Sequence, residues 1–166
     1  SYRTEYADGY AGHFAFFDGD EPMELNGSGA AVMKTPYKSS KTWFVYDEAT
    51  GTYKRFQYQK EHIDGENGNQ LAFTNVIFQF VPGRVIDGKG RMEFDTVGNG
   101  TGKYFTGGKY VDITWSKADL GSPSLFYDGN GDQLAMNPGK TCIYIITTDS
   151  ADNIGIYETE DAFRAS

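Results

Sequence analysis

The longest β-prone run of the sequence covers residues 70–81 and ends at the pair Pro82-Gly83. Its apolar residues fall on both faces of an extended chain: Leu71, Ala72, Phe73, Val76, Ile77, Phe78, Phe80 and Val81. A strand with one face in water alternates apolar and polar residues, so this pattern predicts a central strand that is covered on both sides. The polar pair at 74–75 interrupts the run and predicts a bulge.

Shorter apolar or alternating runs, separated by turn residues, predict further strands. Residues 110–116 alternate cleanly, which is typical of a half-buried strand. Residues 141–147 are apolar on both faces and predict a second inner strand, with Ile143 and Ile145 in the core. Between these strands, the pair Gly107-Gly108 predicts a two-residue hairpin turn.

The fold predicted from this pattern is all-β and mainly antiparallel, a barrel or sandwich of about ten short strands. At most one or two short helices are expected, one of them near residues 158–164. The glycine-rich run 98–102 predicts a sharp bend between strands. Residues 1–166 are predicted to form one domain, because a chain of 166 residues can bury a core without disulfide or metal support.

Composition narrows the classes of partner. The net charge is −8, so a nucleic-acid partner is not expected. The chain contains 12 tyrosines, 12 phenylalanines and 21 glycines, which favours many short strands and tight turns over long helices. No apolar stretch is long enough for a membrane-spanning helix, and no signal peptide is recognisable.

Two motifs suggest chemistry but have simpler structural interpretations. Residues 128–132 begin like a calcium loop, yet Gln133 and Gly139 stand where an EF-hand loop needs its glycine and its bidentate glutamate. A hairpin turn is the better interpretation, and neither a metal nor another cofactor is predicted. The single cysteine, Cys142, lies among isoleucines with no histidine nearby in the sequence, so we predict a core residue and not a nucleophile.

The segment His62-Ile-Asp64 carries the strongest chemical signal. In an extended segment the first and third side chains share a face, so Asp64 could orient the imidazole or share a metal with it, while Ile63 would face the core. No third ligand follows at a useful spacing, and we therefore predict that Asp64 forms a turn and that His62 hydrogen-bonds locally. The candidate polar cluster consists of His62, Asp64, Arg55, Asp87, Arg91 and Asp95, and no catalytic residue is assigned.

An ordered series of motifs resembles the C-terminal domain of the YerB-like bacterial lipoproteins, a family of unknown function. The motifs are Trp43-Phe-Val-Tyr-Asp47, Gly51-Thr-Tyr-Lys-Arg55, His62-Ile-Asp64, Asn75-Val76, Asp87-Gly-Lys-Gly-Arg91, Gly98-Asn-Gly100, Thr114-Trp115, Phe126-Tyr-Asp128 and Asn137-Pro-Gly-Lys-Thr141. The resemblance covers residues 29–147 and leaves 148–166 as a C-terminal extension. Where the family pattern has an aromatic residue, this chain has Cys142, and that substitution suits packing better than catalysis.

The resemblance implies a location outside the cytoplasmic membrane, with a lipid anchor and an α/β domain upstream in a longer parent chain. That upstream domain is absent from these 166 residues. The function expected from this is a non-enzymatic binding or scaffold module for an envelope partner, either a protein or a glycan. The alternative is an envelope hydrolase or transferase whose site is built around His62 and Asp64 and is completed by the upstream domain.

Overall fold

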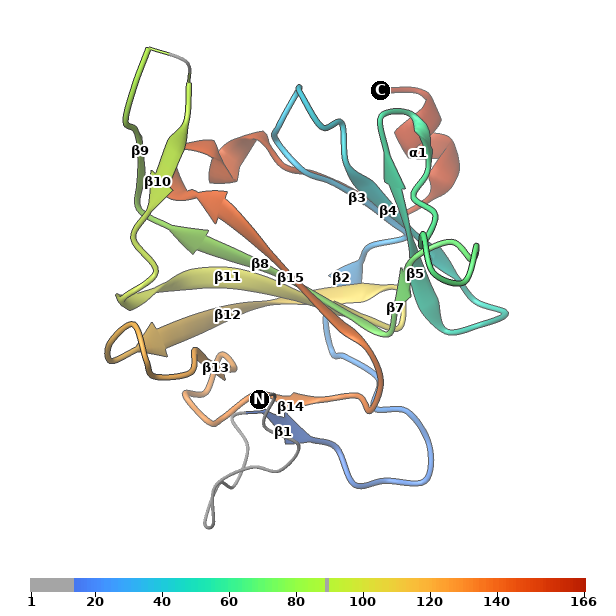
Figure 1. Cartoon of the computed structure of the whole chain (residues 1–166). Coiled ribbons are helices and arrows are strands. Elements are labelled where there is room, and N and C mark those ends of the chain that lie inside the picture. The colour runs from blue at the N-terminus through green and yellow to red at the C-terminus, as the bar shows by residue number, and fades with distance from the viewer. Residues whose placement is uncertain (1–13, 89) are drawn as a thin grey trace.

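A computed structural model describes residues 14–88 and 90–166 as two six-stranded β-sheets that pack face to face, two further sheets of two strands each (β1 with β14, β9 with β10), and short helices near the C-terminus (Figure 1). The strands are β1 Ala15–Phe16, β2 Ser28–Gly29, β3 Val32–Lys34, β4 Trp43–Asp47, β5 Thr52–Gln57, β6 Lys60–Glu61, β7 Ala72–Phe73, β8 Asn75–Val81, β9 Gly83–Val85, β10 Met92–Phe94, β11 Gly98–Thr106, β12 Lys109–Lys117, β13 Leu125–Tyr127, β14 Ala135–Met136, β15 Thr141–Thr147 and β16 Gly155–Tyr157. The helices are the 3-10 helix η1, Thr148–Asn153, and α1, Glu160–Arg164.

The first sheet has the order β13-β12-β11-β8-β15, and β2 also pairs with β12. The second has the order β16-β3-β4-β5-β6, and β7 also pairs with β5. Neither sheet closes on itself, so the predicted all-β fold is confirmed as an open sandwich. Pairing is mainly antiparallel, with β15 on β8 and β1 on β14 as the parallel pairs of the described chain. The described residues form sixteen strands, more than the predicted ten, because five of the strands have only two residues.

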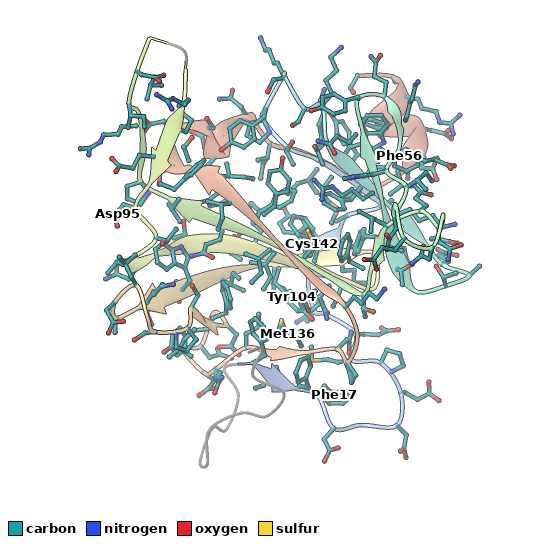
Figure 2. The ribbon with its side chains drawn as sticks, in the orientation of Figure 1. Phe17, Phe56, Asp95, Tyr104, Met136 and Cys142 are labelled. Atoms are coloured by element: carbon teal, nitrogen blue, oxygen red, sulfur yellow. The ribbon has the colours of Figure 1, made fainter. Side chains whose placement is uncertain are left out.

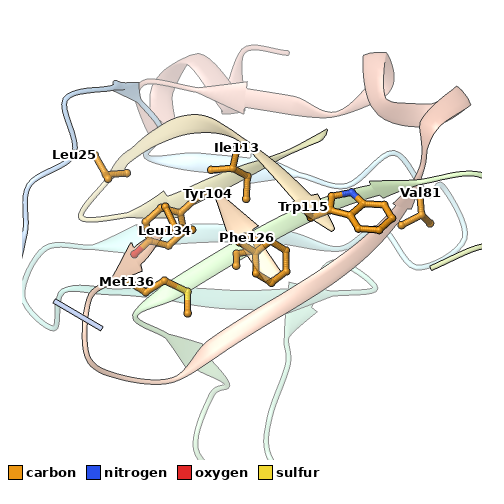
Figure 3. Packing of buried hydrophobic residues seen from close by; sticks show 9 residues of the cluster. Leu25, Val81, Tyr104, Ile113, Trp115, Phe126, Leu134 and Met136 are labelled. Carbon is orange, nitrogen blue, oxygen red and sulfur yellow. The ribbon is translucent and has the colours of Figure 1, made fainter. Parts of the chain in front are cut away.

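The prediction of a doubly covered central strand is confirmed at β8, where all seven residues are buried. Ile77 and Val81 face one core, which they share with residues of β11 to β14 (Figure 3). The alternate residues Val76, Phe78 and Phe80 face a second core, between the two sheets. Apolar residues on both faces of the run are therefore explained by two hydrophobic layers.

The predicted bulge at 74–75 is wrong. The run breaks at Thr74 because the chain passes there from one sheet to the other: Ala72–Phe73 pairs with β5, and Asn75–Val81 pairs with β11 and β15. A single apolar run thus supplies strands to both sheets.

The prediction that residues 141–147 form an inner strand is also wrong. This segment is β15, which stands at the end of its sheet's strand order with β8 as its partner. Ile143 is consequently 37 % exposed, and it is not a core residue. Ile145 is partly buried and packs against the core that contains Ile77 and Val81, so the prediction for this residue holds in part.

The glycine-rich run 98–102 is the first half of strand β11 and not a bend. Its glycines permit close approach: a Cβ atom on Gly100 would lie 2.7 Å from the indole nitrogen of Trp115. That nitrogen donates a hydrogen bond to the carbonyl oxygen of Phe80 at 2.9 Å, across the sheet. The predicted Gly107-Gly108 hairpin is confirmed, with φ of 58° and 73° at its two residues.

The predicted short terminal helix is confirmed as α1. Thr159 caps it by accepting a hydrogen bond from the backbone N–H of Ala162 at 3.2 Å, and Glu160 and Asp161 lie in its first turn, where acidic residues are favoured. In the part of the chain that the structure describes, no helix is long and apolar enough to cross a bilayer.

Candidate functional site

The structure divides the predicted polar cluster into two groups at opposite sides of the molecule. Arg55, His62 and Asp64 belong to the β5 side, and Asp87, Arg91 and Asp95 belong to the β9–β10 hairpin. Figure 2 shows this separation, with Phe56, the neighbour of Arg55, on one side and Asp95 on the other. The six residues therefore do not form one site.

Arg55 and His62 are cross-strand neighbours. The backbone N–H of His62 donates to the carbonyl oxygen of Arg55 at 3.0 Å, in line with the β5–β6 register. Opposed residues of an antiparallel pair project from the same face, and Arg55 also stands opposite the buried Phe44. The guanidinium carbon of Arg55 lies 6.0 Å from the ring centre of Phe44 and 5.8 Å from that of Tyr144, within cation–π range.

Asp64 forms a turn, as predicted. Its carboxylate accepts a hydrogen bond from the backbone N–H of Glu66 at 2.9 Å and another from the side-chain amide of Asn67 at 3.0 Å. The prediction that Ile63 faces the core is wrong, since it is 45 % exposed. The expected local hydrogen bond of His62 is absent at Nδ1, which is buried without a hydrogen-bond partner.

The second group stabilises the β9–β10 hairpin. The carboxylate of Asp87 accepts hydrogen bonds from both the backbone N–H and the guanidinium of Arg91. Asp95 accepts a hydrogen bond from the backbone N–H of Val97 at 3.2 Å, and its own N–H donates to Pro82. These contacts account for the three residues as turn and hairpin residues.

Cys142 faces the space between the sheets, in line with Tyr144 on the same strand. Burial raises the pKa of its thiol, and the nearby positive charge of Arg55 lowers that pKa by a smaller amount. A thiol that stays protonated is a poor nucleophile, which agrees with the prediction of a packing residue. Residues 14–88 and 90–166 also contain no group of three or more His, Cys, Asp or Glu side chains placed to hold a metal ion.

Two asparagines of the motif series build a buried polar network, here called the Asn137 network: Asn75, Tyr104, Asn137, Thr106 and Met23. The hydroxyl of Tyr104 donates to Asn75 Oδ1 at 2.7 Å, and the amide of Asn75 donates to the carbonyl oxygen of Asn137 at 2.8 Å. The side chain of Asn137 accepts from the N–H of Met23 at 2.7 Å and donates to the Met23 carbonyl at 3.0 Å and to Thr106 Oγ1 at 3.1 Å. These residues fix the strand ends and loops, which is a structural role.

A different feature has the character of a binding site. It is a hollow of about 540 Å³, here called the Trp43 pocket, between the β3–β4 loop, the β5–β6 turn and α1. Figure 1 shows these three segments together at the end of the second sheet where the C-terminus lies. The lining residues are Lys34, Thr35, Pro36, Tyr37, Lys38, Lys41, Trp43, Gln59 and Phe163.

The lysines of the Trp43 pocket distinguish it from three other hollows of the described chain. Those hollows contain Arg84, Lys103 and Lys109, each of which forms an ion pair, with Glu93, Asp112 and Glu24 respectively. The lysines at 34, 38 and 41 are exposed, and no ion pair among the described residues includes any of them. They remain available to a negatively charged ligand.

The backbone around the Trp43 pocket is strained. Among the described residues, three that are not glycine have positive φ: Lys41 at 43°, Tyr58 at 52° and Gln59 at 64°. Lys41 and Gln59 line the pocket, and Tyr58 is the chain neighbour of Gln59. The N–H of Tyr58 donates to the carbonyl oxygen of Ser40 at 3.0 Å, which joins the β5–β6 turn to the β3–β4 loop. Strained residues of this kind concentrate at ligand-binding sites, where the surrounding structure holds them in place.

Sequence reasoning missed this pocket, although it named Trp43 as a motif residue. One signal was available: three lysines fall within residues 34–41 of a strongly acidic chain. The contribution of Phe163, more than a hundred residues further along, could be recognised only from the fold.

Two open sheets packed face to face define an all-β sandwich domain, and comparison with known proteins identifies its family. The model of the protein of unknown function (DUF3048) C-terminal domain matches residues 32–143, more than half of the chain. The protein belongs to this family, as the resemblance in the sequence suggested.

The crystal structure of the YerB protein from Bacillus subtilis has the same fold, with a TM-score of 0.67 and 21 % sequence identity. The match covers 87 % of this chain and 46 % of the YerB chain, so the domain spans about half the length of that protein. No curated protein matches the sequence.

Proposed function

We propose that this domain is a non-enzymatic binding module that recognises a partner in the bacterial cell envelope, and that a longer parent chain carries it outside the cytoplasmic membrane on a lipid anchor. The observation that carries the binding role is the Trp43 pocket. Mainly apolar hollows with a few placed polar groups are the usual form of a ligand site, and about 540 Å³ falls within their common range of roughly 300–1,000 Å³.

The envelope setting rests on the family resemblance and on composition. The members that the motif series resembles are lipoproteins, and the net charge of −8 disfavours nucleic acid and anionic lipid surfaces as direct partners. The alternative of a hydrolase or transferase around His62 and Asp64 has weaker support, because the Asp64 carboxylate already accepts two hydrogen bonds in its own turn.

A retention experiment tests this function. The domain is immobilised and exposed separately to envelope and cytoplasmic extracts, beside a variant in which Lys34, Lys38 and Lys41 are all replaced by glutamine. We expect an envelope component that the wild type retains and the variant loses. Equal retention by both proteins, or retention from the cytoplasmic extract alone, would contradict the proposal.

A further inference from the structure

The Trp43 pocket combines a mainly apolar hollow, large enough for a bulky side chain, with a rim of positive charge that no ion pair of the described residues uses. We propose that it binds an acidic peptide segment of a protein partner, with one large apolar side chain in the hollow and flanking carboxylates on the lysines. This inference rests on the proposed binding function and specifies the class of ligand.

The charge of the rim selects an anionic ligand. Lys34, Lys38 and Lys41 have no ion-pair partner in the described chain, whereas the basic residues in the other hollows are paired. On α1, Glu160 is paired with Arg164 at 3.1 Å, which reduces the negative charge beside the pocket. A local positive patch on an acidic domain attracts acidic segments and repels basic ones, so it contributes both association rate and specificity.

The aromatic walls of the hollow are held by contacts within the domain. The ring of Trp43 is stacked on Phe56, with centres 5.1 Å apart and planes 4° from parallel, and Phe163 lies 6.0 Å from it. The hydroxyl of Tyr37 accepts a hydrogen bond from the N–H of Thr147 at 3.1 Å. Preformed apolar walls favour affinity because little side-chain freedom is lost on binding.

The same contacts favour a peptide over a glycan. Sugar rings bind on open, flat aromatic faces, but Phe56 and Phe163 already pack against Trp43, and the ring of Tyr37 contacts Tyr144 at 6.4 Å. The hydroxyl of Thr35 is also occupied, since it donates to the carbonyl oxygen of Thr42 at 3.1 Å. What remains is an apolar hollow, which suits a phenylalanine or leucine side chain as the anchor.

A residue next to the pocket lining offers one further contact for a bound segment. Tyr58 stands on the β5–β6 turn beside Gln59, and 65 % of its surface is exposed. Its positive φ and the hydrogen bond to Ser40 hold the turn against the β3–β4 loop. Exposed tyrosines on fixed backbone are common anchors of protein interfaces.

A titration with defined peptides tests the proposal. The probe is a fluorescein-labelled pentapeptide with one phenylalanine between two pairs of glutamates, followed by fluorescence anisotropy. Its controls replace the phenylalanine by glycine or the glutamates by lysines. We expect saturable binding of the acidic phenylalanine peptide, with affinity that falls as salt is added, and loss of at least about tenfold for either control.

Matched variants locate the binding. The triple variant Lys34→Gln, Lys38→Gln, Lys41→Gln should bind the probe about tenfold or more weakly. The control variant Lys109→Gln, Lys117→Gln, Lys140→Gln removes the same charge elsewhere, and its affinity for the probe should change less than about threefold. Tryptophan fluorescence gives a second readout, because Trp43 lines the pocket and Trp115, the other tryptophan, is 1 % exposed. Trp43→Phe should abolish the response to the peptide.

The outcomes separate this inference from the function on which it rests. If both triple variants lost the same affinity for the probe, or if the glycine control peptide bound as tightly as the probe, the binding would be nonspecific attraction. Either result would overturn the inference. Pocket-dependent binding of polygalacturonate, a polymer of uronic acids, without binding of the peptide would overturn the peptide assignment and leave the binding function in place. If the peptide does not bind and the envelope retention experiment also fails, both the peptide assignment and the proposed binding function are wrong.

Discussion

The Asn137 network and the Trp43 pocket differ in how their polar groups are used. In the network, the side chains of Asn75, Tyr104 and Asn137 are buried and hydrogen-bonded to one another or to backbone. In the pocket, the lysines are exposed without ion-pair partners among the described residues, and two lining residues, Lys41 and Gln59, have positive φ. Paired polar groups stabilise the fold, and unpaired charges beside positive-φ backbone remain for a ligand.

This contrast separates structure from recognition within one motif series. Asn75 and Asn137 are as prominent in the motifs as Trp43, yet their hydrogen bonds are all internal. A motif residue with every partner inside the protein needs no ligand to explain it. Substitutions in the network should therefore lower the free energy of unfolding, and substitutions in the pocket should leave it nearly unchanged.

The largest effect is expected for Asn137→Ala. The substitution removes three side-chain hydrogen bonds and leaves both backbone groups of Met23 and the hydroxyl of Thr106 without this partner. At about 1 kcal/mol or more for each group left unpaired, the free energy of unfolding should fall by roughly 2–4 kcal/mol. Urea denaturation followed by far-UV circular dichroism measures the loss.

Lys38→Ala is the matched variant at the pocket. Lys38 is exposed and outside the ion pairs of the described residues, so stability should change by no more than about 0.5 kcal/mol. Similar stabilities for the Asn137→Ala and Lys38→Ala proteins would disprove the structural role of the network.

A smaller effect is expected for Tyr104→Phe, which removes one hydroxyl from the network. That hydroxyl donates to Asn75 Oδ1 at 2.7 Å and accepts from the N–H of Asn137 at 3.2 Å. Loss of both hydrogen bonds should lower the free energy of unfolding by roughly 1–3 kcal/mol at neutral pH.

The same variant has a distinctive pH dependence. Burial raises the pKa of Tyr104 above its ordinary value. A phenol with a higher pKa in the folded state contributes stability below the unfolded-state pKa of about 10, and that contribution is lost as pH rises toward the folded-state value, by up to ~1.4 kcal/mol per pH unit. Tyr53, whose pKa burial also raises, is present in both proteins. The difference in stability between wild type and Tyr104→Phe should therefore shrink between about pH 9 and about pH 11. A constant difference would mean that Tyr104 ionises normally.

Most of the architecture could be predicted from apolar patterning. The run 70–81 indicated a doubly covered strand, and β8 is buried throughout because two cores meet at it. The errors arose where the pattern alone does not set the pairing. The apolar pattern of residues 141–147 predicts a central strand. In the structure this segment is β15, which lies at the edge of its sheet with β8 on one side, and Ile143 is exposed.

Less of the candidate site could be predicted. The candidate polar cluster included Asp64, Asp87 and Asp95 because they are charged residues in turns. Their carboxylates accept backbone hydrogen bonds, as carboxylates do in many turns. The Trp43 pocket depends on Phe163 reaching β4 from the end of the chain, and no local spacing encodes that contact. The resemblance identified the family correctly. Its motif series contains residues that stabilise the fold, such as Asn75 and Asn137, and it also contains Trp43, which lines the pocket.

The smallest effect, and the one that links strain to binding, is expected for Gln59→Gly. Tyr58 and Gln59 are the two central residues of the β5–β6 turn, and both have the positive φ for which such turns favour Asn-Gly. A non-glycine residue in this conformation costs about 1–2 kcal/mol, while a glycine adds roughly 0.5–1 kcal/mol of unfolded-state entropy, so the variant should be stabilised by about 0.5–1 kcal/mol. Thermal unfolding measures this gain.

Gly107→Ala is the matched control, because Gly107 occupies the β11–β12 turn at φ 58° and a Cβ atom there would meet nothing within 4 Å. It should lose stability by a similar amount, which calibrates the cost of a side chain in this conformation. Because Gln59 lines the pocket, Gln59→Gly should also bind the acidic phenylalanine peptide a few-fold more weakly. A stabilised variant with unchanged peptide affinity would separate the strain from the pocket, whereas no gain in stability would show that the β5–β6 turn holds Gln59 without cost.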